Sequence, residues 1–316
     1  MPWVISYVVG TGTQGHVGDG GPATEALLNN PFDVAFTAAG DMVFSDTFNH
    51  CIRAVDARTG IIRNIAGTGE RGCSGDGGPA ISALLNEPYG VVVARSGEIF
   101  FADRLNGRVR RIDTAGRIGT LAHEGLVEPN GLALNPGQTH LYIADVADHR
   151  VRVVDLSTGA LSTFAGTGAA EHSGDGGLAT AAGIFGARAV AFAPDGSLYV
   201  MERQGSSIRQ IRDGVIQTVA GTPTVRGYEG DGGNASKAVF AAPKEMAVDP
   251  DGNIYVVDTE NHAIRRIDAK TWIVETIAGP GTGAGLARPH GAAVGPDGAI
   301  YIGDSETHRV RKLTRQ

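Results

Sequence analysis

One pattern of apolar and polar positions recurs six times along the chain. Each copy opens with Pro or Ala, continues with a β-branched apolar run, a Gly-containing turn and a second apolar run, and ends on an acid. Short apolar runs bounded by turn residues are typical of β-strands, so each copy predicts a pair of strands. The copies are Pro31–Asp46, Pro88–Asp103, Pro129–Asp145, Ala187–Glu202, Pro243–Asp258 and Pro289–Asp304.

Each copy continues with a polar turn and an Ile-Arg or Val-Arg pair. These pairs are Ile52-Arg53, Val109-Arg110, Val151-Arg152, Ile208-Arg209, Ile264-Arg265 and Val310-Arg311. Most copies then end in a last strand, such as Ile62–Ala66 or Ile216–Ala220. Asp-Gly pairs at 195–196, 251–252 and 297–298 are hairpin signals. Each unit therefore predicts four short strands, which is typical of a propeller blade.

The sixth copy reaches Gln316 after its third strand, and its fourth strand is found at the other end of the chain. Val4–Val9, followed by Gly10-Thr11-Gly12, resembles the last strand of the other copies. We therefore expect an all-β, six-bladed β-propeller of four-stranded antiparallel blades, a single domain over residues 1–316. Its ring is closed by the N-terminal strand completing blade six, because an open ring would leave an unpaired edge.

The repeated phrase resembles the NHL repeat. Tyr255–Arg265 (YVVDTENHAIR) and Tyr142–Arg152 (YIADVADHRVR) carry the resemblance most clearly, and the likeness extends over essentially the whole chain. It implies the six-bladed fold. It leaves the function open, because NHL propellers include amidating lyases, RNA- and protein-binding modules and parts of receptors, and lactonases share the layout.

The composition of the chain disfavours some classes of partner. The formal net charge is −7, which disfavours nucleic acid, because nucleic-acid binders need a basic footprint. The sequence contains no apolar run of transmembrane length, so we expect no membrane association. Met1–Gly10 lacks the features of a signal peptide, which predicts a cytoplasmic protein. Cys51 and Cys73 are expected to be free thiols, with a disulfide between them as the alternative.

What all blades repeat is best explained by the scaffold. The acids that end the second strand are expected to accept N–H bonds from the following turn, and the repeated Arg is expected to pair with them or with neighbouring blades. The turn histidines are also assigned to the scaffold. These residues are Asp46, Asp103, Asp145, Glu202, Asp258 and Asp304, with His50, His149, His262 and His308.

What the blades do not share points to a site. The residues that follow the blade-opening Pro or Ala are Phe32, Tyr89, Asn130, Arg188, Lys244 and His290. The next position is small in four blades, whereas Asp33 and Glu245 break that rule. Such chemical diversity at the start of the first strands predicts a polar ligand site on one face. The alternative is that Arg188 and Lys244 only neutralise these two carboxylates.

Blade four departs twice more from the repeat, because it opens with Ala187-Arg188-Ala189 and ends its second strand on Glu202, followed by Arg203. Four inserts share a Gly-Asp-Gly-Gly motif and a short Ala-rich piece, which we interpret as a turn and one helical turn. The motifs begin at Gly18, Gly75, Gly174 and Gly230. Because the joints 2–3 and 5–6 lack these inserts, we expect two walls that flank a groove for an elongated ligand.

These features support a lyase or hydrolase that acts on a polar or anionic substrate. We expect Tyr89, Arg188 and His290 to be catalytic. The residues expected to bind the substrate are Phe32, Asn130, Glu202, Arg203 and Lys244. A metal variant would place one ion of the Ca²⁺ or Mg²⁺ type among Asp33, Asn130, Glu245 and His290. The three-histidine zinc site of the amidating lyase is not reproduced, since His290 is the only histidine among these positions.

The alternative is a binding module without chemistry, which takes protein, peptide or carbohydrate. Acids rival the cations among the candidate residues, which disfavours RNA and favours protein or carbohydrate as the partner of such a module. For the protein in general, the expected partner is a small-molecule or elongated polar ligand, or a protein or peptide.

Overall fold

The computed structural model describes residues 3–315. Met1 and Pro2, at the start of the segment Met1–Gly10 on which the cytoplasmic expectation rests, lie outside the described residues, as does Gln316. The chain divides into two compact units, one formed by Met1–Pro129 with Pro289–Gln316 and the other by Asn130–Arg288.

The first unit contains blades one, two and six. Blade one runs in chain order through β2 (Pro31–Phe36), β3 (Met42–Asp46), β4 (Cys51–Val55) and β5 (Ile62–Ala66). Blade two consists of β6 (Pro88–Val93), β7 (Ile99–Asp103), β8 (Arg108–Ile112) and β9 (Ile118–Ala122). Blade six has the order β22 (Pro289–Val294), β23 (Ile300–Asp304), β24 (Arg309–Arg315) and β1 (Trp3–Val9).

The second unit contains blades three, four and five. Blade three consists of β10 (Pro129–Leu134), β11 (His140–Asp145), β12 (Arg150–Asp155) and β13 (Leu161–Ala165). Blade four consists of β14 (Ala187–Phe192), β15 (Leu198–Glu202), β16 (Ser207–Arg212) and β17 (Val215–Ala220). Blade five consists of β18 (Glu245–Val248), β19 (Ile254–Asp258), β20 (Ala263–Ile267) and β21 (Val274–Ala278).

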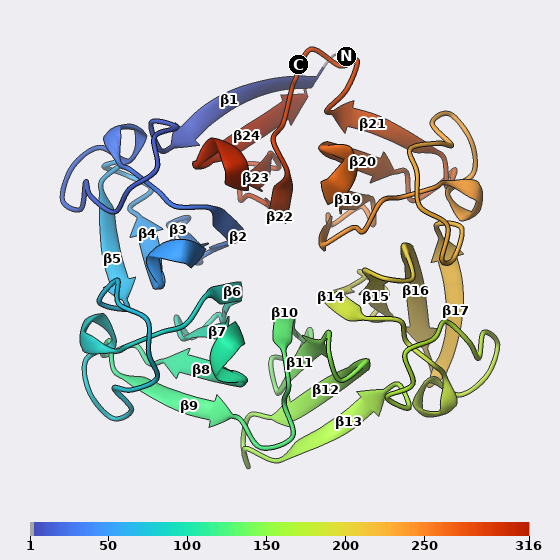
Figure 1. The fold of residues 1–316 in the computed structure, drawn as a ribbon, viewed down its shortest axis with the longest axis horizontal. Helices are drawn as coiled ribbons and strands as arrows, with labels where there is room; N and C mark the ends of the chain where they lie inside the picture. Colours follow the sequence, from blue (N-terminus) through green and yellow to red (C-terminus); the bar gives the residue numbers. More distant parts are fainter. Residues whose placement is uncertain (1–2, 316) are drawn as a thin grey trace. The chain divides into compact units, whose positions relative to one another are not determined.

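The N-terminal strand completes blade six, as the sequence predicts. β1 pairs antiparallel with β24, with Trp3 opposite Arg315 and Ile5 opposite Leu313. Figure 1 shows β1, in blue, beside β24, in red. The all-β prediction of six four-stranded antiparallel sheets is confirmed, since the helices in the described residues are short 3-10 turns. No helix among residues 3–315 is long and apolar enough to cross a membrane.

Local chemistry explains why the hairpins form where they do. The Asp-Gly pairs predicted to be turns join the first and second strands of blades four, five and six, and their glycines adopt the left-handed backbone, with φ of 85° at Gly196 and 86° at Gly252. Glycine adopts this conformation without steric cost. The second strands are buried along their whole length in blades one, four and five. Their apolar residues lie in the cores between sheets, and the acid that ends each strand is buried as well.

The Gly-Asp-Gly-Gly inserts form turns followed by single 3-10 turns, as expected. Those turns are η1 (Ala23–Glu25), η3 (Ala80–Ser82), η5 (Ala179–Ala181) and η6 (Ala235–Lys237), and the first Ala of each is buried. The prediction that the inserts wall a groove beside the first strands is wrong. Each insert instead pairs with the fourth strand of the blade that follows it, for example at Pro22–Ile61 and Asn234–Ile273. The fourth strand is the opposite edge of the sheet from the first.

The acid that ends the second strand links three parts of its blade. In blade one, Asp46 accepts the Asn29 N–H at 2.7 Å and the Asn49 side-chain amide at 2.9 Å, and it lies 3.4 Å from Arg53. The backbone donor in blade one therefore precedes the first strand, so the expected bond from the following turn is wrong there; in blade three Asp145 does accept the N–H of Asp148 from the following turn, at 3.4 Å. The same preceding donor binds Asp103, Glu202 and Asp258. The expected pairing with the repeated Arg is confirmed.

The turn histidines have a structural role, as predicted. His50 and His308 adopt left-handed backbone conformations, and their Nδ1 atoms accept N–H bonds from Glu87 and Asn30, which precede the first strand of the next blade. His149 and His262 make the same bond in the second unit. Both cysteines are free, with Cys51 buried and Cys73 exposed.

Candidate functional site

The first strands of neighbouring blades approach closely at their starts. A Cβ atom added to Gly131 would lie 2.7 Å from the Cα of Ala189. This contact explains why a small residue is repeated at that position. The pairing with the second strand is also irregular there, with register shifts at 31–34, 88–91, 187–189 and 289–291. A shifted register turns the side chains before it out of the regular alternation.

In the first unit, three of the predicted site residues pack together as rings. The rings of Phe32 and His290 are stacked with centroids 4.0 Å apart, and Tyr89 meets Phe32 edge-on at 4.8 Å. All three side chains are buried, Tyr89 completely and the other two to 5% exposure. The structure therefore brings Phe32, Tyr89 and His290 together, as the sequence predicts, in an aromatic cluster.

Asp33 connects two blades of the same unit. Its Oδ1 accepts the Val34 N–H and its Oδ2 accepts the Val91 N–H, both at 2.8 Å. Burial raises the pKa of Asp33 to about 7, although the two N–H bonds oppose that rise. Asp33 departs from the small-residue rule because its carboxylate binds the backbone of β6.

In the second unit, four cationic side chains gather near the starts of β14 and β18. We call Arg188, Arg203, Lys244 and Arg288 the cation cluster. Lys244 and Arg188 are each only 4% exposed. Glu260 is the acid among them, 3.6 Å from the Nζ of Lys244 and 2.9 Å from a guanidinium nitrogen of Arg288. Arg188 also donates a hydrogen bond to the side-chain carbonyl of Asn130.

The electrostatics of the cation cluster are most evident at Lys244. Burial, together with the positive charges of Arg188, Arg288 and Arg203, lowers the pKa of Lys244 to about 7 against the opposing charge of Glu260. Partial burial raises the pKa of Glu260, but the hydrogen bonds and charges of Arg288 and Lys244 outweigh it and hold that pKa below its usual value. An anion placed here would relieve the repulsion among the cations.

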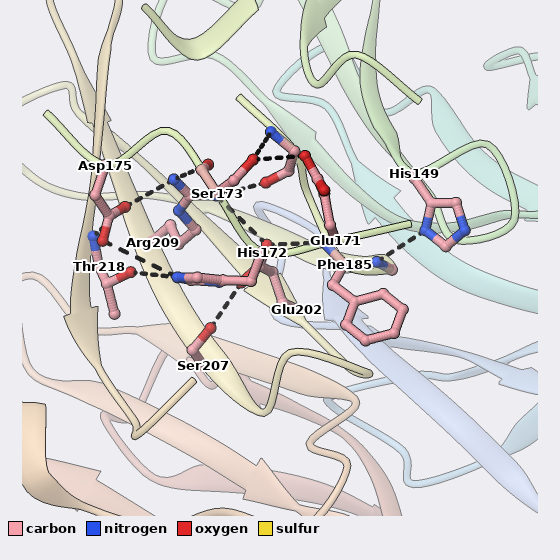
Figure 2. Close-up of polar contacts among 12 residues, drawn as sticks. His149, Glu171, His172, Ser173, Asp175, Phe185, Glu202, Ser207, Arg209 and Thr218 are labelled. Carbon is pink, nitrogen blue, oxygen red and sulfur yellow. Dashed lines mark hydrogen bonds and ion pairs between the residues drawn. The ribbon is translucent and has the colours of Figure 1, made fainter. Parts of the chain in front are cut away.

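Glu202, the residue that marks blade four in the sequence, lies in a separate polar cluster (Figure 2). Its Oε1 accepts the Phe185 N–H at 2.8 Å, and its Oε2 accepts the Ser207 hydroxyl at 2.7 Å. His172 Nδ1 also bonds to Oε2, and its Nε2 lies 3.0 Å from the Thr218 hydroxyl. Because a carboxylate only accepts, Nδ1 carries the hydrogen.

This polar cluster compensates for a missing side chain. In blades one, two and five, an Asn three residues after the acid donates to it. Blade four has Gly205 there, and a Cβ at Gly205 would lie 2.7 Å from Oε2 of Glu202. The longer Glu202 fills the space of the Asn, and His172 and Ser207 supply the donors. Glu202, predicted to bind substrate, is completely buried and structurally engaged.

Replacing His172 with Ala is expected to lower the free energy of unfolding by about 1–3 kcal/mol, because Glu202 then loses a donor inside the protein. Urea unfolding monitored by tryptophan fluorescence measures this. The matched control is His140→Ala, whose side chain is 41% exposed and whose loss is expected to change the stability by less than about 0.5 kcal/mol. Equal effects of the two substitutions would contradict the structural role of His172.

The predicted metal residues are divided between the units, with Asp33 and His290 in the first and Asn130 and Glu245 in the second. Glu245 is buried and accepts the N–H of Met246 at 3.0 Å. Among residues 3–315, no group of three or more His, Cys, Asp or Glu side chains is arranged to hold a metal ion. The divalent metal stays a prediction.

Sequence reasoning missed three residues of these clusters. Glu260 and Arg288 lie in the turn after β19 and the joint before β22, at positions whose residues vary from blade to blade. His172 had a recognisable signal. It occupies the position held by His16, Cys73 and Tyr228 in the other inserts, and the loss of the Asn at Gly205 implies a substitute donor.

Two family descriptions match segments of the chain. The NHL repeat matches residues 286–313, and the teneurin NHL domain matches residues 222–282. Among curated proteins, teneurin-3 of Danio rerio is 30% identical over 298 residues, which covers 76% of this chain and 11% of the teneurin. The chain thus spans about a tenth of the length of that relative. Together with the six repeats and sheets, these matches define an NHL-repeat protein.

Solved structures agree with this fold. An auxiliary nutrient binding protein of Bacteroides thetaiotaomicron has a TM-score of 0.74 at 16% identity, with 99% of this chain and 76% of that chain covered. Virginiamycin B lyase of Staphylococcus aureus has a TM-score of 0.64 at 14% identity, with 99% and 100% covered. The chain is a six-bladed β-propeller of the NHL-repeat type, with lyase-like neighbours in fold.

Proposed function

We propose that this protein is a propeller lyase or hydrolase whose substrate carries an anionic group bound by the cation cluster. Arg188 and Lys244 would contact the anionic group, with Arg203 and Arg288 adding to the positive potential. The observation that carries this proposal is the burial of Lys244 among three arginines, which lowers its pKa to about 7. Perturbed pKa values of this kind concentrate at functional sites.

The free energy that it costs to gather four cations supports a functional interpretation of the cation cluster. Like charges brought together in a buried place oppose folding, so a scaffold alone gains nothing from gathering them. Glu260 interacts with both Lys244 and Arg288. A ligand carboxylate, phosphate or sulfate beside Lys244 would add negative charge among these cations. Lys244 would then take up a proton, because an adjacent anion raises its pKa.

A screen of anions by thermal unfolding at pH 7 tests the binding half of the proposal. Small carboxylates and phosphate esters that occupy the cation cluster are expected to raise the Tm of the wild-type protein. Arg188→Gln is expected to weaken the effective ligand at least about tenfold, because a charge-assisted hydrogen bond is lost. The control is Arg212→Gln, since that side chain is 56% exposed. A ligand that stabilises both variants equally does not bind where we propose.

Turnover tests the assignment of Tyr89 and His290, which lie in the first unit, as catalytic residues, independently of the anion site in the second unit. Tyr89→Phe and His290→Ala are expected to reduce kcat by about 100-fold or more if these side chains transfer protons in the reaction. The neighbour virginiamycin B lyase, similar in fold, supports a lyase as the first reaction class to assay. If both variants retain full turnover of a substrate, the assignment of Tyr89 and His290 as catalytic is wrong.

The second candidate is a binding module without chemistry. It is favoured by the tight packing of Tyr89 and His290 against Phe32 and by the nutrient binding protein of similar fold. Loss of anion binding in Arg188→Gln, with no turnover of any bound compound, would support the binding module.

The metal-dependent alternative is tested by mass spectrometry of the purified protein. A stoichiometric divalent ion that a chelator removes would favour a metal-dependent mechanism over a metal-free one.

A further inference from the structure

Four of the six fourth strands have their outer edge covered by an insert, through the same two backbone bonds. In blade one, the Ile62 N–H donates to the Gly21 carbonyl at 3.0 Å and the Gly20 N–H donates to the Ile62 carbonyl at 2.8 Å. The equivalent residues are Ile118 with Gly77 and Gly78, Ile216 with Gly176 and Gly177, and Val274 with Gly232 and Gly233. Each insert therefore lies on its sheet like a short added strand.

The aspartate of each insert is recognised by side chains of the same sheet. In blade four, Asp175 lies 2.7 Å from the Arg209 guanidinium and accepts the Thr218 N–H at 3.0 Å. Hydrogen bonds from Thr218 and the charge of Arg209 hold the pKa of Asp175 below its usual value despite its partial burial. In blade two, Asp76 is held in the same way by Arg110 and Thr120.

Blade three has the receiving groups but no insert. Arg152 on β12 pairs with Thr163 on β13, in the register of Arg209 with Thr218 and of Arg110 with Thr120. Leu161 lies opposite Val154, as Ile62 lies opposite Val55. The joint that leads into this blade, residues 123–128, lacks the motif. Within residues 3–315, no segment forms the two backbone bonds at Leu161 that the other blades form.

We propose that the outer edge of β13 binds an extended, glycine-rich polypeptide segment with an aspartate, of the Gly-Asp-Gly-Gly type, supplied by a partner protein. The Leu161 N–H and C=O would pair with the backbone of that segment, as in strand addition. Arg152 and the Thr163 N–H would bind its aspartate. The chain's own four inserts are the template for this ligand.

Two details of the template specify the partner. The glycines flanking the insert Asp have positive φ, 100° at Gly75 and 80° at Gly77, so a partner needs glycine at both positions. In blades one and two, Arg53 and Arg110 contact the acid of their own blade and the insert Asp together. Arg152 already pairs with Asp148 at 3.3 Å, and by this precedent it can hold a second carboxylate alongside.

Blade six also lacks an insert of this kind and serves as a comparison for blade three. In its fourth strand, Ile5 occupies the position that corresponds to Leu161 of blade three. Its position opposite Arg311, however, is occupied by Tyr7, whose ring lies 5.1 Å from that guanidinium. Because the Tyr7 ring packs against the Arg311 guanidinium in blade six, we expect the aspartate to bind in blade three.

The test is a titration of the isotope-labelled protein with a synthetic peptide of the sequence Ser74–Ala80 (SGDGGPA), followed by the amide NMR signals. We expect saturable shifts of Leu161 and Thr163, and no comparable shift at Ile62 or Thr218, whose edges are occupied. An Asn-for-Asp peptide and the Arg152→Gln variant should each weaken binding roughly tenfold or more. Unchanged Leu161 and Thr163 signals at millimolar peptide would overturn the proposal, as would equal binding of the Asn peptide.

A proline pair separates binding from folding. Leu161→Pro removes the outward N–H and is expected to abolish peptide binding without lowering Tm, since edge positions tolerate proline. Ile62→Pro removes the equivalent N–H where it is bonded to Gly21 and is expected to lower Tm. If Leu161→Pro binds the peptide as well as wild type, strand addition at β13 is wrong. Peptide-independent dimerisation through this edge, lost in Leu161→Pro, would show that a second copy occupies it and would also overturn the proposal.

Discussion

Replacing Arg265 with Met is expected to lower the free energy of unfolding by about 3–5 kcal/mol, the usual cost of removing one partner of a buried ion pair. The Arg265 guanidinium donates to the carbonyls of Val239 and Glu229, and it binds Asp231 at 2.7 Å. It also lies 3.7 Å from the buried Asp258. Its removal leaves all four groups without this partner, and only backbone bonds such as those between Val274 and Gly232 and Gly233 then hold the insert on blade five.

The control for Arg265→Met is Arg152→Met, the same change in the blade without an insert. Arg152 pairs with Asp148 but stabilises no insert, so the expected loss is about 1 kcal/mol or less. Urea unfolding at pH 7 measures both variants. Similar losses in the two variants would contradict the role of the repeated Arg in holding the inserts.

The loss of unfolding free energy in Arg265→Met is also expected to depend on pH. Burial raises the pKa of Asp258 to about 6, and Arg265 is among the groups that oppose this rise. Without Arg265 the folded-state pKa rises further, so the folded state binds a proton that the unfolded state releases. The variant should therefore be closest to wild type near pH 5 and most destabilised near pH 8.

Replacing Lys244 with Met is expected to raise the stability of the ligand-free protein by about 1–2 kcal/mol at pH 7 and to abolish anion binding. The stability gain follows because a buried cation that repels Arg188, Arg203 and Arg288 is removed. Affinity for the anion should fall at least about 100-fold, since a direct charged contact is lost. Gain of stability with loss of binding is typical of a functional residue.

The pH dependence of the Lys244→Met difference has a definite sign. The folded-state pKa is about 7, against 10.5 for an unperturbed lysine. Between these values the unfolded chain binds a proton that the folded protein does not, so wild-type stability gains from rising pH, whereas the variant has no such gain. The advantage of Met should be full at pH 7 and below and should shrink towards pH 10. The control is Lys270→Met at an exposed position. An advantage that is constant over this range would contradict the cause we assign.

The sequence predicted the blades because their information is local. Strand alternation, Asp-Gly turns and the Ile/Val-Arg pairs lie within each copy, and Val4–Val9 resembled a fourth strand closely enough to be placed beside the third strand of blade six. The scaffold roles of His50 and Asp46 followed from their repetition. The gathering of Phe32, Tyr89 and His290 followed from their equivalent positions in three blades.

The positions of the inserts could not be predicted in this way. The partner of Gly20 is Ile62, in a strand that follows three others, and no local pattern distinguishes an insert that covers the fourth strand from one that extends over the first. The cation cluster was only partly predicted. Arg188, Arg203 and Lys244 stood out from the repeat, but Glu260 and Arg288 lie at positions whose residues vary from blade to blade, and their convergence depends on packing.

The ionisation of Lys244 tests the central claim most directly. The protein carrying ¹³C-labelled lysine is titrated by NMR, with Lys244→Met used to assign the signal, in the absence and the presence of the anion identified by thermal screening. The account predicts a pKa of about 7 without ligand and a rise of at least about one unit when the anion binds. A value near 10.5 without ligand, or no change on binding, would show that the cation cluster is not the anion site.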